Sequence, residues 1–380
     1  MAEHFCSSLH PLTPPLKEEE RLSWLRLIRS RKVGVATFHR LLKEHGSASA
    51  ALDALPKIAE AAGVKDYEVF SSAAAQAELK AGQRAKARLI AMGDPDYPAA
   101  LLELNDAPPL IWAVGTPEIM TKPKVAMVGA RNASSLGTRM ARRLAADLSD
   151  AGFVVVSGLA RGVDAATHTG ALEGGTIAVM AGGVDVLYPA ENADLAVKIA
   201  ESGVRISEMP FGCEPRARHF PQRNRLISGL SQGVVVVEAA AQSGSLITAR
   251  NALDQGRDVF AVPGHPFDGR AAGGNLLIRD GAMLVRNAND VIEALESTAM
   301  ELPLAPPDHK PPTELHPDTA NLHREILDRL GPSPVAEDQL IRDLGRPASQ
   351  VSPELFSLEV EGRIARAPGG LLSLNPQPTD

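Results

Sequence analysis

The sequence predicts an α/β protein, in which a Rossmann-like, doubly wound parallel sheet carries an N-terminal helical domain and a C-terminal winged-helix domain. Short, continuously apolar runs alternate with helical segments through the middle of the chain. Ala-rich segments with helical spacing precede them, and three helical segments and a hairpin follow a Pro-rich stretch. Such alternation of strand and helix is typical of an open parallel sheet. We expect a flexible tail at 1–17, a helical domain at 18–84, the Rossmann-like core at 85–298, a linker at 299–318 and the winged helix at 319–380.

The first 84 residues are expected to be helical after a short tail. The tail combines prolines with charges and lacks a basic segment followed by an apolar stretch, so it is not a signal peptide. Leu22, Leu25 and Ile28 then recur at helical spacing, and Gly46 is placed to close a helix. Residues 18–84 are therefore expected to form a small helical domain.

Composition restricts the compartment and the distribution of charge. The 380 residues are 44% hydrophobic, with a net charge of −7. Two cysteines, Cys6 and Cys213, fit a reducing, cytoplasmic setting, and no apolar run approaches the roughly 18 residues of a membrane span. Residues 21–45 hold seven Lys/Arg against one Glu, and residues 205–225 hold five Arg against two Glu. A basic patch is therefore expected locally despite the acidic total.

The central block contains six runs whose hydrophobicity is continuous. Parallel strands that are covered on both faces require this pattern, whereas a half-exposed strand alternates. Segments of helical length and pattern, such as 138–152, separate the runs. The predicted strands are 125–130, 153–158, 176–183, 204–209, 233–239 and 258–264.

Residues 319–380 follow a stretch with six prolines between 299 and 318, which marks a semi-rigid linker. Three helical segments and a hairpin with Pro-Gly-Gly at its tip then predict a winged helix. Its third helix holds Glu354, Glu359 and Glu361 against Arg363. Because carboxylates repel duplex phosphates, we expect this domain to serve protein contacts and to add little DNA affinity.

Loops after the predicted strands carry the residues from which we expect a binding site, because ligands of open parallel sheets bind beyond the carboxyl ends of the strands. Gly129 and Arg131 follow the first strand, and Ser157 and Gly158 end the second. The dinucleotide fingerprint GxGxxG is absent from the first loop. Asp164 and His168, further along, are interpreted as structural residues.

The fourth and fifth strands lead into the most informative loops. The excursion 210–225 places Arg223, Asn224 and Arg225 beside Phe220, which could stack a base, just before a helix. Ser243, Gly244 and Ser245 then open a helix as a plausible phosphate cradle. Several such loops in a row favour a groove for a run of phosphates. We expect Arg131, Arg223 and Arg225 to converge on one strip of the sheet edge. No metal-ligand spacing, Walker motif or nucleophile–base pair is found, so catalytic residues, cofactors and metals are not predicted.

Seven ordered segments of the central block resemble the DNA-processing protein A family (DprA, also called Smf): VGARNASSLG, VVSGLARGVDAATHTGAL, GGTIAVMAGGVDVLYPAEN, ISEMPFG, FPQRNRLISGLS, VVVEAAAQSGSLITARNALDQGR and VFAVPG…GGNLLIRDGA. The first block is similar to that family's helix-hairpin-helix or SAM-like domain, and the third to its winged helix. The resemblance implies a single-stranded-DNA-binding protein of natural transformation that protects incoming strands and loads the RecA recombinase. It also implies help in displacing single-strand-binding protein and a homodimer formed through the Rossmann-like core.

By motif match, the resemblance assigns DNA contacts to Arg131, Ser157-Gly158, Arg223, Asn224 and Arg225, and less firmly to Ser243–Ser245. Gln222 stands where lysine is frequent in the family. A nucleotide-cleaving enzyme similar to lysine-decarboxylase-like phosphoribohydrolases remains the alternative. Its PGGxGTxxE motif has only partial counterparts here, Ala181-Gly182-Gly183 and Glu238. A transcription regulator that acts through the winged helix is a third class, which the acidic third helix disfavours.

Overall fold

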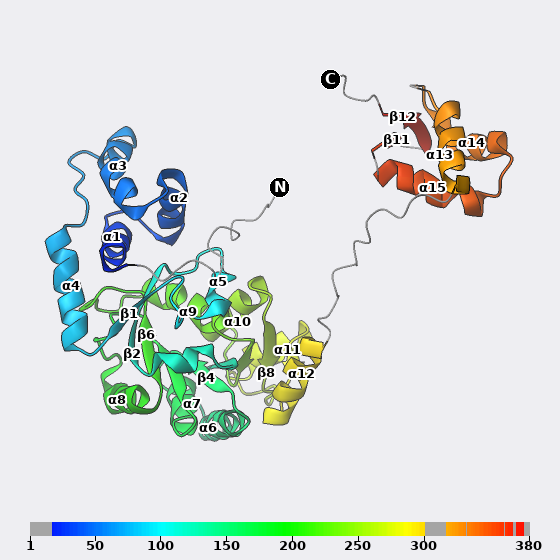
Figure 1. The fold of residues 1–380 in the computed structure, drawn as a ribbon. Helices are drawn as coiled ribbons and strands as arrows, with labels where there is room; N and C mark the ends of the chain where they lie inside the picture. Colours follow the sequence, from blue (N-terminus) through cyan, green and yellow to red (C-terminus); the bar gives the residue numbers. More distant parts are fainter. Residues whose placement is uncertain (1–16, 301–316, 332, 361, 368–369, 376–380) are drawn as a thin grey trace. The chain divides into compact units, whose positions relative to one another are not determined.

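A computed structural model describes residues 17–300, 317–331, 333–360, 362–367 and 370–375 (Figure 1). The chain forms two compact units that divide near residue 301. The predicted tail lies outside the described residues, as does most of the predicted linker. No helix in the described ranges is long and apolar enough to cross a membrane.

The N-terminal helical domain is confirmed. It consists of α1 (Glu18–Arg29), α2 (Val35–His45), α3 (Ala48–Ala61) and α4 (Ser72–Arg84). Gly46 ends α2 in the left-handed conformation, with φ of 74°, which glycine adopts without steric cost. The hydroxyls of Ser47 and Ser71 accept hydrogen bonds from backbone N–H groups in the first turns of α3 and α4. Trp24 and Phe38 pack edge to face at 5.1 Å and are almost fully buried.

The central sheet is mostly parallel, as predicted, and has nine strands in the order β1-β2-β6-β5-β4-β3-β7-β8-β9. The strand order reverses between β3 and β7. This reversal is the topological switch point at which open sheets bind ligands. The strands are β1 (Arg88–Ala91), β2 (Leu110–Gly115), β3 (Lys124–Val128), β4 (Val154–Ser157), β5 (Thr176–Val179), β6 (Val204–Ser207), β7 (Gly233–Val236), β8 (Asp258–Ala261) and β9 (Met283–Leu284).

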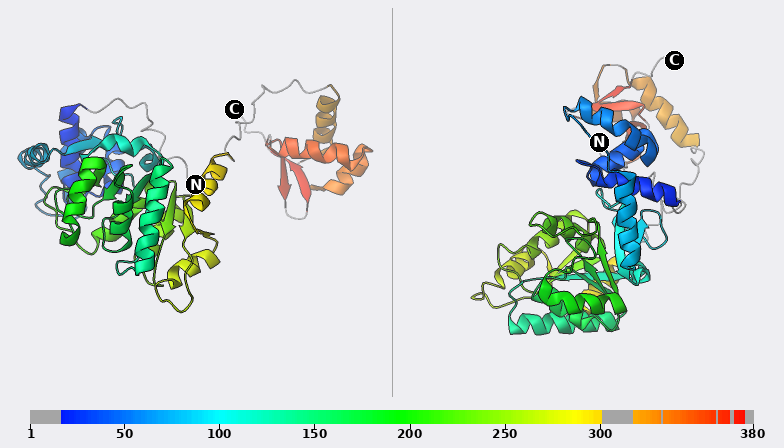
Figure 2. Two further views of the ribbon diagram at one scale, coloured as in Figure 1. Left: turned by 90° about the horizontal axis from the view of Figure 1, so that it is seen from below. Right: turned by 90° about the vertical axis from the view of Figure 1, so that its left-hand side faces the viewer.

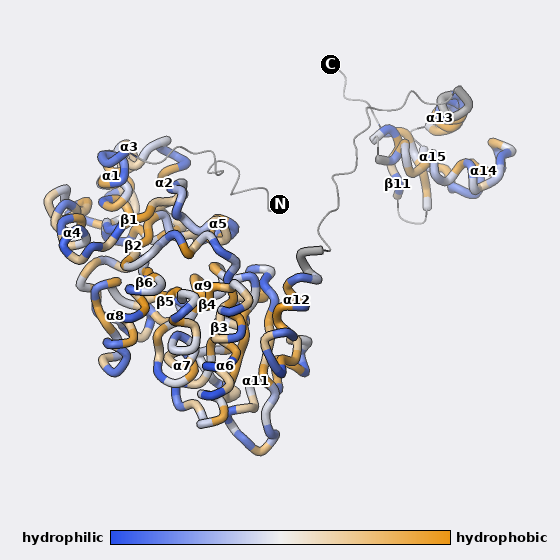
Figure 3. The backbone as a smooth tube through the Cα atoms, turned by 60° about the horizontal axis from the view of Figure 1, so that its bottom comes forward, coloured by the Kyte–Doolittle hydropathy of each residue, from blue (hydrophilic) through white to orange (hydrophobic). Residues whose placement is uncertain are grey.

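Alternate residues of each parallel strand enter two different apolar layers. Val125 and Met127 pack with α6 (Ser135–Asp150), α7 (Val163–Gly170) and α12 (Ala288–Met300). Ala126 and Val128 belong to the opposite layer, which includes α9 (His219–Gly229) and α10 (Ser245–Asp254). Both faces are therefore covered, as the continuous hydrophobicity of the strands requires. The strands run as hydrophobic segments through the interior in Figure 3, and Figure 2 gives two further views of the helices around them.

Three details of the sheet differ from the expectation. The six predicted strands end one to four residues earlier, because their last residues turn into the loops at the carboxyl edge. The antiparallel strands β1 and β2 at one edge were not predicted as strands, and the Asp- and Pro-rich segment 94–98 lies between them. The other edge strand, β9, has only two residues.

The C-terminal unit has the predicted winged-helix elements: α13 (Pro317–Arg329), α14 (Glu337–Leu344), α15 (Ala348–Val360) and the hairpin of β11 (Ile364–Ala367) with β12 (Leu371–Leu374). A short strand, β10 (Val335–Ala336), pairs with β12. Leu355 and Leu358 are buried in its own apolar core, whereas 66% of Phe356 is exposed. Helix α12 continues through Met300 and α13 begins at Pro317, so the first two and the last two residues of the predicted linker are helical.

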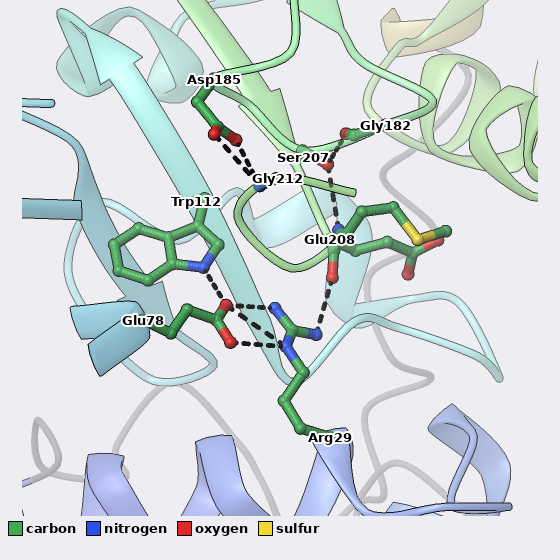
Figure 4. A network of polar contacts seen from close by, with 9 residues as sticks. Arg29, Glu78, Trp112, Gly182, Asp185, Ser207, Glu208 and Gly212 are labelled. Carbon is green, nitrogen blue, oxygen red and sulfur yellow. Dashed lines mark hydrogen bonds and ion pairs between the residues drawn. The ribbon is translucent and has the colours of Figure 1, made fainter. Parts of the chain in front are cut away.

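A buried polar cluster joins the N-terminal helices to the sheet (Figure 4). The Arg29 guanidinium contacts the Glu78 carboxylate at 2.9 Å and donates a hydrogen bond to the carbonyl of Glu208, just past β6. The indole N–H of Trp112 on β2 donates to the same carboxylate at 2.9 Å. Glu78 therefore satisfies donors from α1 and β2 at once, which fixes the helical domain on the edge of the sheet.

Replacement of Glu78 by Ala is expected to lower the free energy of unfolding by about 3–5 kcal/mol, because it leaves the Arg29 guanidinium buried without its partner. Glu44→Ala is the matched control, since it removes an exposed carboxylate that pairs with Arg40 one helical turn away. That change should cost about 0.5 kcal/mol or less. Urea unfolding of both variants measures the difference, and equal losses would contradict the role given to Glu78.

Candidate nucleic-acid interface

The first turns of α9 contain residues that were expected in a loop. The excursion after β6 was predicted to run to Arg225, but α9 begins at His219. Phe220, Arg223, Asn224 and Arg225 therefore lie on a helix. Successive helical residues differ by about 100° around the axis, so Arg223 and Arg225 point away from each other. Arg131, Arg223 and Arg225 were expected to converge on one strip because all three follow carboxyl ends of strands. Arg131 and Arg223 do border the same hollow, whereas Arg225 pairs with Glu208 and Asp106 on another face of α9, so the expectation is wrong for Arg225.

Arg223 points into the protein. It is 5% exposed, and its Nη1 donates to the carbonyl oxygens of Gly158 and Val179, each at 2.5 Å. Burial lowers the pKa of its guanidinium to about 10, against the favourable charge of nearby Asp164. The Nη1 atom of Arg223 is thus engaged by the protein itself, and little of the side chain is exposed to a ligand. In this structure Arg223 holds α9 against the carboxyl ends of β4 and β5.

Arg225, on another face of α9, is neutralised by carboxylates. It pairs with Glu208 at 2.6 Å and with Asp106 at 3.1 Å, and 14% of its side chain is exposed. Burial raises the pKa of Glu208, while the charge of Arg225 opposes that rise. The structure thus places Arg225 in a polar cluster beneath α9, away from Arg131.

Arg131 and Phe220 are brought together at the surface. The Arg131 guanidinium lies over the Phe220 ring, 5.1 Å from its centroid, and the Tyr188 ring lies 5.9 Å from that of Phe220. Together they line a pocket of about 480 Å³, here called the Tyr188 pocket. Its lining also includes Asn132, Gly158 to Arg161, Met180 to Gly182, Val186, Pro189 and Pro215. Aromatic faces beside a cation suit a base and its phosphate.

A second hollow of about 620 Å³, here called the Ser243 groove, continues from the first. Arg131, Asn132, Ala160 and Phe220 line both hollows. The Ser243 groove further contains Gly129, Arg223, Asn224, Ser243, Gly244, Ser245 and Arg270. The Ser243 and Ser245 hydroxyls are 2.7 Å apart at the start of α10. Loops that follow β3, β4, β5, β7 and β8 thus border one continuous depression.

Ser157 and Gly158 occupy the floor of this depression. Ser157 is fully buried, and its hydroxyl donates to the Met127 carbonyl at 2.7 Å, so the hydroxyl is not directed outward. Gly158 lines the Tyr188 pocket. A Cβ atom on Gly158 would lie 2.1 Å from Nη1 of Arg223, so only glycine permits this guanidinium to reach the Gly158 carbonyl.

Asp164 and His168 are structural, as the sequence predicted. The Asp164 carboxylate accepts hydrogen bonds from the N–H groups of Gly158 and Ala160, and burial raises its pKa. His168 is fully buried: Nε2 accepts from the Leu159 N–H at 3.3 Å, and Nδ1 lies 2.9 Å from the Thr176 hydroxyl. That hydroxyl donates to the Val155 carbonyl, so Nδ1 carries the proton. Both side chains stabilise the loop after β4 from below.

The switch point itself is filled by a carboxylate of the chain. Glu238, after β7, accepts from the Ser134 N–H at 2.8 Å and from the Ser134 hydroxyl at 2.5 Å, at the first turn of α6. A Cβ atom on Gly137 would lie 2.3 Å from the Glu238 carboxyl carbon. A nucleotide phosphate would bind at this helix end in a dinucleotide-binding fold. Here the Glu238 carboxylate occupies that helix end, which argues against a nucleotide cofactor at this position.

Tyr188, Asn132, Arg161 and Arg270 were not singled out from the sequence. Tyr188 lies inside one segment of the family resemblance, VDVLYPAEN, but it is remote in sequence from Phe220. Arg161 pairs with Glu191 at the rim. Asn132 directly follows Arg131, but only the order of the strands brings Tyr188, Arg161 and Arg270 to the same depression, and a local pattern contains no such information.

Comparison with known proteins identifies three regions of the chain. Residues 88–296 match the model of the family described as DNA recombination-mediator protein A. Residues 18–81 match a DprA-like N-terminal HHH domain, and residues 310–370 match a DprA winged helix domain.

Individual relatives agree with these matches. The chain is 39% identical to Protein Smf of Escherichia coli over 283 residues, which cover 73% of this chain and 75% of that protein. It is 43% identical to the DNA processing protein DprA of Bacillus subtilis over 209 residues, or 54% and 70% of the two chains. The crystal structure of DprA from Streptococcus pneumoniae superposes with a TM-score of 0.55 at 35% identity, covering 69% of this chain and 98% of that one.

A structure of DNA processing protein A from Helicobacter pylori, reported for its single-stranded DNA binding mode, superposes with a TM-score of 0.52 at 30% identity. It covers 56% of this chain and 97% of that one. The likeness therefore lies at the level of sequence as well as fold.

The buried His168 predicts a pH dependence of stability. Burial, together with the charge of Arg223, lowers its pKa to about 3, against an ordinary value of 6.5. Between these values the unfolded chain binds a proton that the folded chain does not, so stability falls as the pH falls from about 6.5. His168→Gln should remove up to about 1.4 kcal/mol per pH unit of that slope. Denaturant unfolding at pH 7 and pH 5 measures it, and an unchanged slope would show that His168 is not the responsible group.

Proposed function

Because the chain belongs to the DNA recombination-mediator protein A family, we propose that it binds single-stranded DNA along the carboxyl edge of its sheet. The observation that carries this proposal is the continuous depression formed by the Tyr188 pocket and the Ser243 groove. Arg131 and Phe220 line both parts and are in direct contact with each other. A ligand with repeated phosphates and exposed aromatic faces fits such a depression better than a single nucleotide does.

Each part of the depression has a distinct role in this proposal. Arg131 lies between the two hollows and neutralises the backbone of the strand. The rings of Tyr188 and Phe220 offer faces for an unpaired base, and a paired base in a duplex cannot present its face to them. Ser243, Gly244 and Ser245 contribute backbone and hydroxyl donors to a neighbouring phosphate. Asn224 lines the groove, while Arg223 and Arg225 position α9.

We further propose binding without catalysis. Two titratable residues near the depression are held by hydrogen bonds to the loop after β4 or by burial. Asp164, which borders the Ser243 groove, accepts from two backbone N–H groups, and His168 is fully buried. Glu238, the counterpart of the acidic residue in the phosphoribohydrolase motif, is held by Ser134. All three groups are engaged within the protein, which disfavours the nucleotide-cleaving alternative.

The finer role that follows from the family is to protect incoming strands in the cytoplasm, to load the RecA recombinase and to help displace single-strand-binding protein. A homodimer through the Rossmann-like core is part of this proposal. It is supported by the open edge at β9, where Met283 and Leu284 are 49% and 42% exposed. An unpaired strand edge with apolar side chains is suited to a second copy of the same edge.

Arg131→Ala is expected to weaken single-stranded DNA binding and to reduce the salt slope of log K by about 0.7, the value for one phosphate contact. Lys198→Ala is the matched control, since it removes an exposed cation from α8 (Ala193–Ser202), and it should change neither quantity. Arg225→Ala should lower stability and leave the salt slope intact. Fluorescence anisotropy with labelled oligo-dT at several salt concentrations provides the measurement. If Arg131→Ala behaves like the control, the depression is not the binding site.

The winged-helix unit is expected to contribute little to DNA affinity. In that unit Arg366 forms ion pairs with both Glu337 and Glu359, which leaves its charge compensated. A chain that ends at residue 301 retains the first compact unit with α12 complete. It should bind oligo-dT within about tenfold of the full chain, a difference of about 1.4 kcal/mol. A larger loss would show that the acidic unit contacts DNA after all.

A further inference from the structure

The loop between β8 and α11 (Ala272–Arg279) presents an aromatic side chain to solvent. Phe267 is 95% exposed, the highest value among the large hydrophobic residues described. Among the described residues its ring contact is with His265, at 5.5 Å with the planes tilted by 38°. The loop does not bury this ring against the rest of the described protein, so core packing does not account for its position.

Hydrogen bonds within the loop hold its backbone in one conformation. The Asp268 N–H donates to the His265 carbonyl and the Ala271 N–H donates to the Asp268 carbonyl, both at 2.9 Å. Asn275 on α11 accepts from the Gly264 N–H at 3.1 Å and donates to its carbonyl at 2.9 Å. These bonds close both ends of the loop. A ring presented by a fixed loop loses less entropy when it binds a partner than a ring on a mobile one.

This loop borders the DNA depression on one side and a further hollow on the other. Arg270 lines the Ser243 groove. His265 and Asp268 line a hollow of about 560 Å³ whose opposite wall on α6 includes Arg139 and Arg143. Phe267 therefore lies between residues of two hollows, with Arg270, which pairs with Asp268 at 3.0 Å, on one side and Arg139 and Arg143 on the other. A DNA strand that extends from the Ser243 groove past Arg270 would next contact the Phe267 ring.

We propose that Phe267 forms a second base-stacking site for the same DNA strand, at the far end of the carboxyl edge from the Tyr188 pocket. The phosphates next to the stacked base face the guanidinium groups of Arg270 and Arg139. This inference rests on the proposed function, which it extends by assigning the direction and length of the bound strand.

The sheet sets the spacing of the two stacking sites. The Tyr188 pocket follows β5 and Phe267 follows β8, and β4, β3 and β7 lie between them. Four steps between strands amount to about 19 Å. A stacked strand advances roughly 3.4 Å per nucleotide, so about six nucleotides connect the two sites, and fewer if the strand is extended. Short oligonucleotides should therefore use one site and longer ones both.

A single strand fits this place better than a protein surface. Phe267 is the one exposed large hydrophobic residue of this loop, and the exposed residues beside it are His265, Pro266, Gly269 and Arg270, which do not form a large apolar patch. Protein interfaces bury several neighbouring apolar residues around such an anchor, whereas a base covers one ring. A second copy of this chain on Phe267 is the competing occupant, and the experiment below distinguishes it.

The test measures oligo-dT binding by the full chain over lengths from about 3 to about 15 nucleotides, the range of single-strand sites. Phe267→Ala should leave the shortest oligonucleotides unaffected and weaken the longer ones about fivefold to 100-fold, as expected for one stacked base. Phe267→Trp should retain binding, and its fluorescence should be quenched by the longer oligonucleotides only. Phe356→Ala, which truncates the exposed phenylalanine of the winged helix, is the control and should have no effect at any length.

Each result separates this inference from the proposed function. If Arg131→Ala weakens binding at every length but Phe267→Ala does so at none, the strand does not reach the loop and the second site is refuted. If neither variant changes binding, the depression itself is wrong. If Phe267→Ala changes the mass of the protein in light scattering while its DNA affinity is unchanged, the ring contacts a second copy and the proposal is overturned.

Discussion

The buried guanidinium of Arg223 is the constraint on which the depression formed by the Tyr188 pocket and the Ser243 groove depends. It links α9 to the carbonyl oxygens at the ends of β4 and β5. A charged group at this depth is costly unless it is compensated, and two carbonyls and the nearby Asp164 provide that compensation. These hydrogen bonds fix the rotation of α9 about its own axis. Phe220, one turn earlier, is consequently held under Arg131, and Asn224 faces the groove.

Glycine and carboxylate residues at the sheet edge then decide which ligand fits. Gly158 leaves the space that Arg223 occupies, and Glu238 fills the helix end at the switch point where a nucleotide phosphate would bind. The edge is therefore closed at its centre to a bound nucleotide, while Arg131 and the aromatic rings remain accessible beside it. A helix end that is closed to nucleotides, beside an accessible cation and aromatic rings, is consistent with a polynucleotide that passes along the edge. It also agrees with the absence of a cofactor fingerprint in the sequence.

The sequence predicted the architecture well because its signals are local. Continuous apolar runs identified the parallel strands, and Gly46 was correctly expected to end α2. The site was predicted less completely. Arg223 and Arg225 were expected to act together because both follow the carboxyl end of a strand, but the start of α9 at His219 turns them to different faces. Tyr188 and Arg270 were missed because only the order of β5, β3 and β8 in the sheet makes them border the same depression.

Photo-crosslinking of the full chain to an oligo-dT that carries 4-thiothymidine, followed by mass spectrometry of the peptides, tests the location of the bound strand most directly. Crosslinks are predicted in the segments that border the depression, foremost at Tyr188 and Phe220, because an activated base reacts with the side chains it touches. Crosslinks confined to α1–α4 or to the winged-helix unit would contradict the assignment of the carboxyl edge as the DNA-binding surface.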